Sequence, residues 1–423
     1  MRELQELVEA NIITLEKAEE IKHYFAQKKS KPDKRLTIVF GILGALLVGL
    51  GIILIIAHNW DDLNKVTKLF IAFLPLAVGQ VICAFSIFKR PNSVAWREAS
   101  STFLFFAIAS SISIVSQVYN IHGNLGRFLL VWMLLSLPII YTSRSSVASL
   151  LYWIGITWYA CEVSYFQYPQ QTAYYYWLLV AAAITHYWRL MVGSATSNFT
   201  IFHHWLIPLS LTISIGMFGR DADGLMVVCY LILFSIFVSI AQYDFLSGRK
   251  IISNGYLVIG SLGTIALSLF LTFNTYWDWI SKDNSTWGKS EASIVLIVLV
   301  LIATVLMFVL LRNRQWHQLK MKSYTYIFFV LLAIVGSGLP ALAQILANLA
   351  VLALAVFIMR DGAEKESLGL LNCGLLTIAA LIACRFFDTE LSFVLRGLLF
   401  IGLGVSFFAA NYWLIQKKKQ KKG

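Results

Sequence analysis

Apolar residues gather in long stretches that recur from residue 36 almost to the C-terminus. A helix needs about 20 residues, at about 1.5 Å of rise each, to cross a bilayer. Fourteen stretches approach that length. Twelve is the alternative count, because the stretches between 102 and 161 are short and two others meet at Gly338-Leu339-Pro340. The candidate spans are 36–57, 67–88, 102–118, 125–141, 145–161, 174–190, 203–219, 224–243, 255–273, 293–312, 323–338, 341–359, 367–384 and 393–414.

This pattern predicts an all-α, polytopic integral membrane protein with about 14 transmembrane helices. We expect a cytoplasmic helical hairpin and basic linker over residues 1–35, a transmembrane bundle over 36–414 and a basic cytoplasmic tail over 415–423. The composition agrees, since 58% of the 423 residues are hydrophobic and 13% are charged, against about 25% charged in soluble domains. The lipid bilayer is therefore the predicted partner of most of the surface.

The distribution of basic residues predicts the orientation. Lys and Arg number 34 against 22 Asp and Glu, and both tails are basic, at residues 28–35 and 417–422. Cytoplasmic loops collect Lys and Arg. Counting loops alternately across fourteen spans places 26 of the 34 cations on the side of the tails. We therefore expect both termini in the cytoplasm.

The N-terminal segment carries apolar residues at helical spacing between charged ones, and Thr14 is placed to cap a helix that starts at Leu15. Its apolar stripe has two interpretations: packing within the hairpin or against the bundle, or docking of a cytoplasmic protein partner on residues 1–28. The basic run that follows matches anionic headgroups. No nucleic-acid-binding module accompanies it, so no nucleic-acid partner is expected.

Small residues mark one face of the first span. Gly41, Ala45 and Gly49 recur every four residues, a spacing that lets another helix approach closely within a membrane. A hinge at Gly49 and Gly51 is the alternative interpretation.

Two strings carry a resemblance to a known family: GILGALLVGLGIILIIAHNW at 41–60 and QVYNIHGN at 117–124. They resemble a bacterial family of predicted membrane proteins with domain of unknown function 2157, and the string Arg385-Phe386-Phe387-Asp388 looks similar too. Where that family is expected to have Gly-Asp, this chain has Gly123-Asn124. The resemblance implies a bacterial inner-membrane protein and no established activity.

Candidate ligand-binding residues lie at the predicted outer ends of the spans, and no Asp or Glu lies in the middle of one. Arg396 falls inside the last span, where an ionisable residue is a functional candidate; snorkelling to the interface beside Asp388 or Glu390 is the alternative. If Arg127, Arg385 and Arg396 lie close together, they would form an outward-facing pocket for a phosphate or carboxylate. The predicted substrate-binding residues are Asn59, Trp60, Asp61, Gln117, Tyr119, Arg127, Arg385 and Arg396.

Other chemistry finds little support in the sequence. Five cysteines show no CxxC spacing, and His186 with His203-His204 lacks an acid or cysteine at ligand spacing. No metal, cofactor or catalytic residue is predicted, and an enzyme is not expected. The leading hypothesis is a transporter or flippase-like protein for an amphipathic or anionic small molecule or lipid. The alternative is a non-catalytic scaffold or sensor that recruits a partner through the N-terminal hairpin.

Overall fold

The structure is a computed structural model that describes residues 8, 10, 13–29, 34–58, 64–166, 171–219, 222–243, 246, 251–283, 288–312, 325–388 and 393–420. All regular secondary structure in these ranges is helical, which confirms the all-α prediction. The chain forms two compact units, each described by itself. Unit 1 comprises Met1–Ile156 and Trp177–His186, and unit 2 comprises Thr157–Tyr176 and Tyr187–Gly423.

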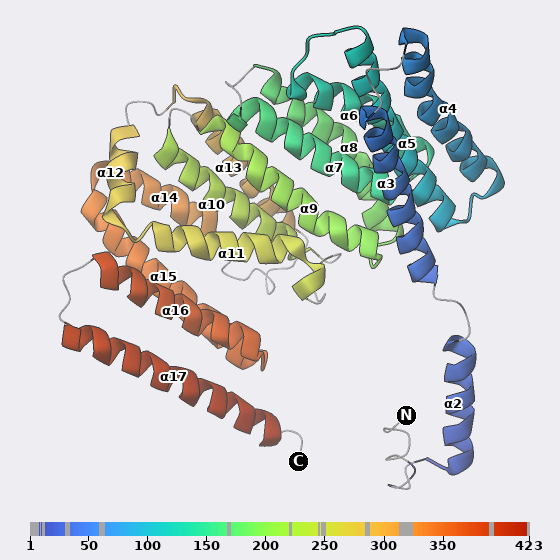
Figure 1. Ribbon diagram of the computed structural model, residues 1–423. Coiled ribbons are helices and arrows are strands. Elements are labelled where there is room, and N and C mark those ends of the chain that lie inside the picture. Colours follow the sequence, from blue (N-terminus) through green and yellow to red (C-terminus); the bar gives the residue numbers. More distant parts are fainter. Residues whose placement is uncertain are drawn as a thin grey trace. The chain divides into compact units, whose positions relative to one another are not determined.

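The helices follow one another with short connections (Figure 1). The first six are α2 (Leu15–Lys29), α3 (Lys34–His58), α4 (Lys65–Lys89), α5 (Val94–Val118), α6 (Leu125–Thr142) and α7 (Ser146–Cys161). The next elements are η1 (Glu162–Phe166), η2 (Gln171–Tyr174), α8 (Tyr175–Gly193), α9 (Asn198–Ile215), η3 (Gly216–Phe218), α10 (Asp223–Ile240) and η4 (Ile251–Ser253). The last are α11 (Gly255–Phe270), α12 (Asn274–Asp283), α13 (Glu291–Arg312), α14 (Thr325–Gly338), α15 (Pro340–Glu364), α16 (Leu368–Asp388) and α17 (Phe393–Gln420).

The described residues do not support a count of fourteen spans. They contain 8 helices long and apolar enough to cross a membrane, or up to 9 if the bent pair α11–α12 forms one span. Three further apolar stretches are shorter: Val39–Gly51, Tyr326–Gly338 and Phe400–Trp413. A physical reason is visible in α7 and α14, whose 16 and 14 residues cover less than a hydrocarbon core of about 30 Å at 1.5 Å per residue.

Unit 1 is built around α5, which packs against α3 and α4. The predicted small-residue face of α3 does meet another helix: a Cβ on Gly49 would lie 3.3 Å from the Cβ of Phe106, and one on Gly41 would lie 3.8 Å from that of Ala99. The neighbouring helix is α5 in both cases. The close-packing prediction for this face is therefore confirmed.

Gly49 should tolerate a large side chain poorly. We expect Gly49→Leu to lower the free energy of unfolding by about 1–3 kcal/mol, the usual cost of overpacking a tight contact. Thermal unfolding of the purified protein in detergent measures the change. Gly44→Leu on the same helix is the matched control, because a Cβ there would meet nothing within 4 Å. Equal melting temperatures for the two variants would contradict the proposed packing role.

A buried carboxylate fixes the start of α7 in unit 1. Glu98 of α5 is fully buried and accepts hydrogen bonds from the backbone N–H groups of Ser146 (3.2 Å) and Val147 (2.9 Å) and from the Ser145 hydroxyl (2.5 Å). The first N–H groups of a helix have no partner within it, and the helix N-terminus favours negative charge. Glu98 therefore caps α7 from a different helix, and the Arg97 Nε atom lies 3.4 Å from its carboxylate.

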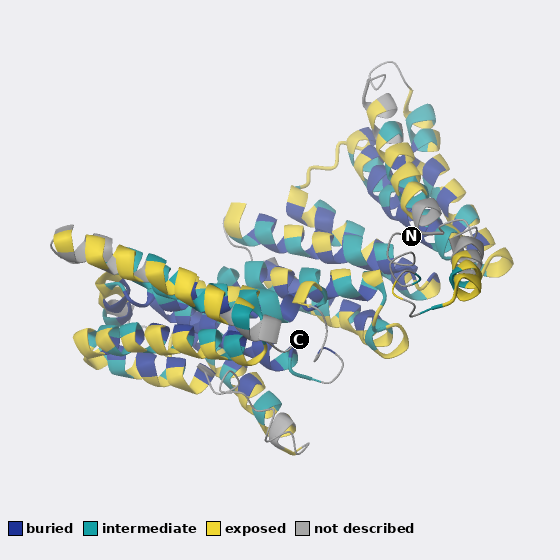
Figure 2. Ribbon diagram, turned by 90° about the horizontal axis from the view of Figure 1, so that it is seen from below, coloured by how far each residue is buried: buried dark blue, intermediate teal, exposed yellow. Residues whose placement is uncertain are grey.

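Unit 2 surrounds α10, which packs against α11, α13, α14 and α12. From Leu225 to Val238, every residue of α10 is apolar except Cys229, Tyr230 and Ser235. This is expected for a helix enclosed by others. In the other helices, buried residues lie on the faces that meet another helix and exposed residues lie on the outer faces (Figure 2). Wide exposed apolar faces of this kind suit a lipid environment.

The N-terminal hairpin prediction is only partly within the described residues. α2 begins at Leu15, and the Lys17 backbone N–H lies 3.5 Å from the Thr14 hydroxyl, so the predicted cap position is confirmed. The first arm of the hairpin lies mostly outside the described residues.

Candidate functional site

The backbone of unit 2 breaks sharply between α11 and α12. The two helices meet at an angle of 87° across Leu271–Phe273. Trp277 of α12 is buried against this break, and its Nε1–H donates to the Leu271 carbonyl at 2.8 Å. Gly336 of α14 leaves room for the indole, since a Cβ there would lie 2.2 Å from Trp277 Cζ3. Trp277 thus stabilises the break, and Gly336 provides the space for its indole ring.

Side chains from two later helices bind the carbonyl oxygen of Thr272, which lies in the break two residues after the end of α11. It accepts from Arg385 Nη2 at 2.7 Å, from Gln344 Nε2 at 3.1 Å and from Asn348 Nδ2 at 3.5 Å. The last carbonyls of a helix lack intrahelical partners, and lipid supplies none. A cation is also favourable at a helix C-terminus. Arg385 further lies 5.3 Å from the centre of the Phe273 ring, within cation–π range.

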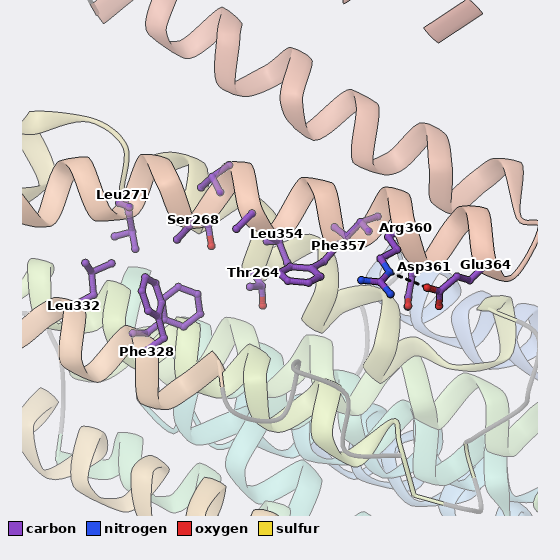
Figure 3. A pocket seen from close by; sticks show the side chains of 16 residues that line it. Thr264, Ser268, Leu271, Phe328, Leu332, Leu354, Phe357, Arg360, Asp361 and Glu364 are labelled. Carbon is purple, nitrogen blue, oxygen red and sulfur yellow. Dashed lines mark hydrogen bonds and ion pairs between the residues drawn. The ribbon is translucent and has the colours of Figure 1, made fainter. Parts of the chain in front are cut away.

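A groove runs from this break along α15. It has a volume of about 590 Å³, within the range of about 300–1,000 Å³ usual for small-molecule sites. α11 contributes Thr264, Ser268 and Leu271, α14 contributes Phe328, Phe329 and Leu332, and α15 contributes residues between Ala347 and Glu364. Figure 3 shows Leu271 and Leu332 near one end and the charged side chains at the other. The groove is therefore amphipathic along its length.

Three ionisable side chains of α15, Arg360, Asp361 and Glu364, form the charged end of the groove. Arg360 Nε lies 2.8 Å from Glu364 Oε1, and Asp361 Oδ2 lies 2.8 Å from Lys365 Nζ. Both are exposed or half-exposed pairs one helical turn apart, a class worth only about 0.3–0.5 kcal/mol. A ligand headgroup could exchange partners with these pairs at little cost.

Ser268 adds a polar group to the middle of the groove wall. Its side chain is 5% exposed, and its hydroxyl has no hydrogen-bond partner among the described residues. An unsatisfied buried hydroxyl costs about 1–3 kcal/mol.

The residues predicted from the sequence lie at several places. Gln117 and Tyr119 are exposed at the end of α5, and Arg127 is exposed in the first turn of α6, all in unit 1. Arg385 lies in unit 2, where its guanidinium binds Thr272. The remaining positions, Asn59, Trp60, Asp61 and the side chain of Arg396, lie outside the described residues.

The histidines His186, His203 and His204 belong to two different units. In unit 2, His203 Nδ1 lies 2.8 Å from the Phe199 carbonyl and His204 Nδ1 lies 3.3 Å from that of Ser253. His186 belongs to unit 1 and is buried. Within the described ranges, no group of three or more His, Cys, Asp or Glu is placed to hold a metal ion.

The groove residues were missed in the sequence. Two signals could have pointed to them: the small residues Ala347, Ala350 and Ala353, and the ion-pair spacing of Arg360 with Glu364 at the end of a span. Both features are common in membrane helices when taken singly. Only the packing of α11 and α14 beside α15 combines them into one site.

Together, the apolar helices and their irregular break define a polytopic α-helical membrane protein. Residues 5–149 match the family model described as "Predicted membrane protein (DUF2157)", which confirms the resemblance drawn from the strings near residues 41 and 117. The match covers unit 1 residues only, so the groove lies beyond it. No curated protein and no solved structure matches the chain.

Proposed function

We propose that this protein is a transporter or flippase-like protein of a bacterial inner membrane, and that the groove binds an amphipathic small molecule or lipid. The observation that carries the proposal is the groove itself, apolar along α11 and α14 and charged where α15 ends. A molecule with an apolar chain and a polar head matches that division. Phe328 and Phe357, 37% and 42% exposed, leave the groove open at its side.

The break beside the groove supports the same proposal. Transporters commonly place their binding sites where membrane helices are interrupted, because freed backbone groups and small side-chain clusters collect there. Leu271 belongs both to the break and to the groove wall, and the neighbouring Thr272 is held by α15 and α16. A movement of either helix would therefore change the end of the groove.

The proposed orientation follows from the basic tails. With both termini in the cytoplasm, α17 and α16 would each cross the membrane once, so the loop between α15 and α16, which carries Lys365, would also face the cytoplasm. The charged end of the groove then meets the inner leaflet. Amphipathic molecules would enter sideways from that leaflet, with the headgroup at the charged end.

The test is transport by purified protein in vesicles after the groove has been filled. Ala353 lines the groove and is exposed, so Ala353→Phe adds bulk there without entering the protein core. We expect movement of a fluorescent phospholipid between leaflets to slow by about tenfold or more, because a loss of about 1.4 kcal/mol in lipid binding corresponds to a tenfold change. Quenching of the outer leaflet measures the rate.

Leu352→Phe is the matched control, because Leu352 is 42% exposed on the same helix but does not line the groove. It should leave the rate unchanged. Absence of lipid movement with the unmodified protein, or equal rates for the two phenylalanine variants, would overturn the proposal.

A further inference from the structure

Acids and cations are paired at the charged end of the groove. Arg360 Nε lies 2.8 Å from Glu364 Oε1, and Lys365 Nζ lies 2.8 Å from Asp361 Oδ2, so the four charges cancel. An anionic headgroup that bound Arg360 would leave Glu364 without its partner and would lie beside a like charge. The lining therefore disfavours a purely anionic amphiphile and favours a ligand that also carries a positive charge.

Resting on the function proposed above, we infer that the groove binds a zwitterionic phospholipid, whose headgroup carries both a phosphate and an ammonium. The phosphate would bind Arg360, whose planar guanidinium suits phosphate oxygens. The ammonium would bind the Glu364 carboxylate, released from its 2.8 Å pair with Arg360, and would lie beside Asp361, which also pairs with Lys365. Each charge then keeps an opposite partner, so the exchange leaves no charge uncompensated.

The length of the groove agrees with a phospholipid. From Ala347 to Glu364, α15 rises about 25 Å at 1.5 Å per residue. One leaflet of the hydrocarbon core is about 15 Å deep, half of about 30 Å. A single acyl chain and its headgroup therefore fit along this wall.

The experiment measures binding without transport, so the two proposals can fail separately. The full-length purified protein is cross-linked by light to phosphatidylethanolamine that carries a photoreactive group in its acyl chain, and the labelled peptides are identified by mass spectrometry. We expect labelling in α11 and α15. Unlabelled phosphatidylethanolamine should compete about tenfold better than anionic phosphatidylglycerol with the same chains, because only its ammonium pairs with the two acids.

The double variant Asp361→Asn with Glu364→Gln should still be labelled but should lose this preference, with the two lipids competing about equally. Glu291→Gln is the matched control, since this exposed acid of α13 lies outside the groove and should keep the preference.

Three results would overturn the inference: labelling outside α11, α14 and α15, equal competition in the unmodified protein, or a retained preference in the double variant. Competition by a single-chain quaternary ammonium detergent as strong as that of phosphatidylethanolamine would remove the role of the phosphate. If the lipids bind as expected but do not move between leaflets in vesicles, the transport proposal would be wrong and the lipid-binding inference would still hold.

Discussion

Glu98→Ala is expected to lower the free energy of unfolding by at least about 3 kcal/mol, because it leaves a buried backbone N–H, a half-buried backbone N–H and a buried hydroxyl without their acceptor, and each such loss costs about 1–3 kcal/mol. The groups concerned are the backbone of Ser146 and Val147 and the side chain of Ser145. Thermal unfolding of the purified protein in detergent would measure the loss.

Two further variants distinguish the loss of the hydrogen bonds that cap α7 from the loss of a negative charge. Glu98→Gln keeps an acceptor oxygen and removes the charge, so its loss should be intermediate. Glu291→Ala removes an exposed acid that lies in the first turn of α13 and accepts from the Tyr174 hydroxyl. Exposed pairs of that kind contribute about 0–1 kcal/mol. If Glu98→Ala destabilised the protein no more than Glu291→Ala, the proposed role of Glu98 at the start of α7 would be wrong.

Features read within one helix were predictable from the sequence. The Gly41–Gly49 spacing indicated a face for close helix packing, and that face meets α5. Likewise, Thr14 precedes α2 as its position before Leu15 suggested. Such predictions succeed because the helical period alone decides which residues share a face.

Features that join distant parts of the chain were not predictable in this way. Glu98 and Ser146 are 48 residues apart, and Arg385 and Thr272 are 113 apart. The break at Leu271–Phe273 contains neither Gly nor Pro, so nothing local ends the predicted span 255–273 three residues early. Tertiary contacts at Thr272 and Trp277 supply the partners that the interrupted backbone needs.

Arg385→Met is expected to lower the free energy of unfolding by about 2–3 kcal/mol, since hydrogen bonds to charged groups contribute about 1.5–3 kcal/mol. Its Nη2 atom binds both the carbonyl and the hydroxyl of Thr272, at 2.7 and 3.2 Å. Gln344→Ala removes a neutral bond to the same carbonyl and should cost about 1 kcal/mol. The same unfolding measurement, made on protein without added ligand, compares the two variants.

This measurement also decides between two roles for Arg385. The sequence presented it as a residue that holds an anionic ligand, whereas its position at the end of α11 suits a residue that holds the break in place. A ligand-holding arginine would leave the stability of the ligand-free protein nearly unchanged when replaced by methionine, because its contribution would arise only on binding. A break-holding arginine would lower that stability with or without ligand. Arg385→Lys keeps the charge but lacks the fork of donors, so a loss between those of the unmodified protein and Arg385→Met would assign the effect to the geometry of the guanidinium at Thr272.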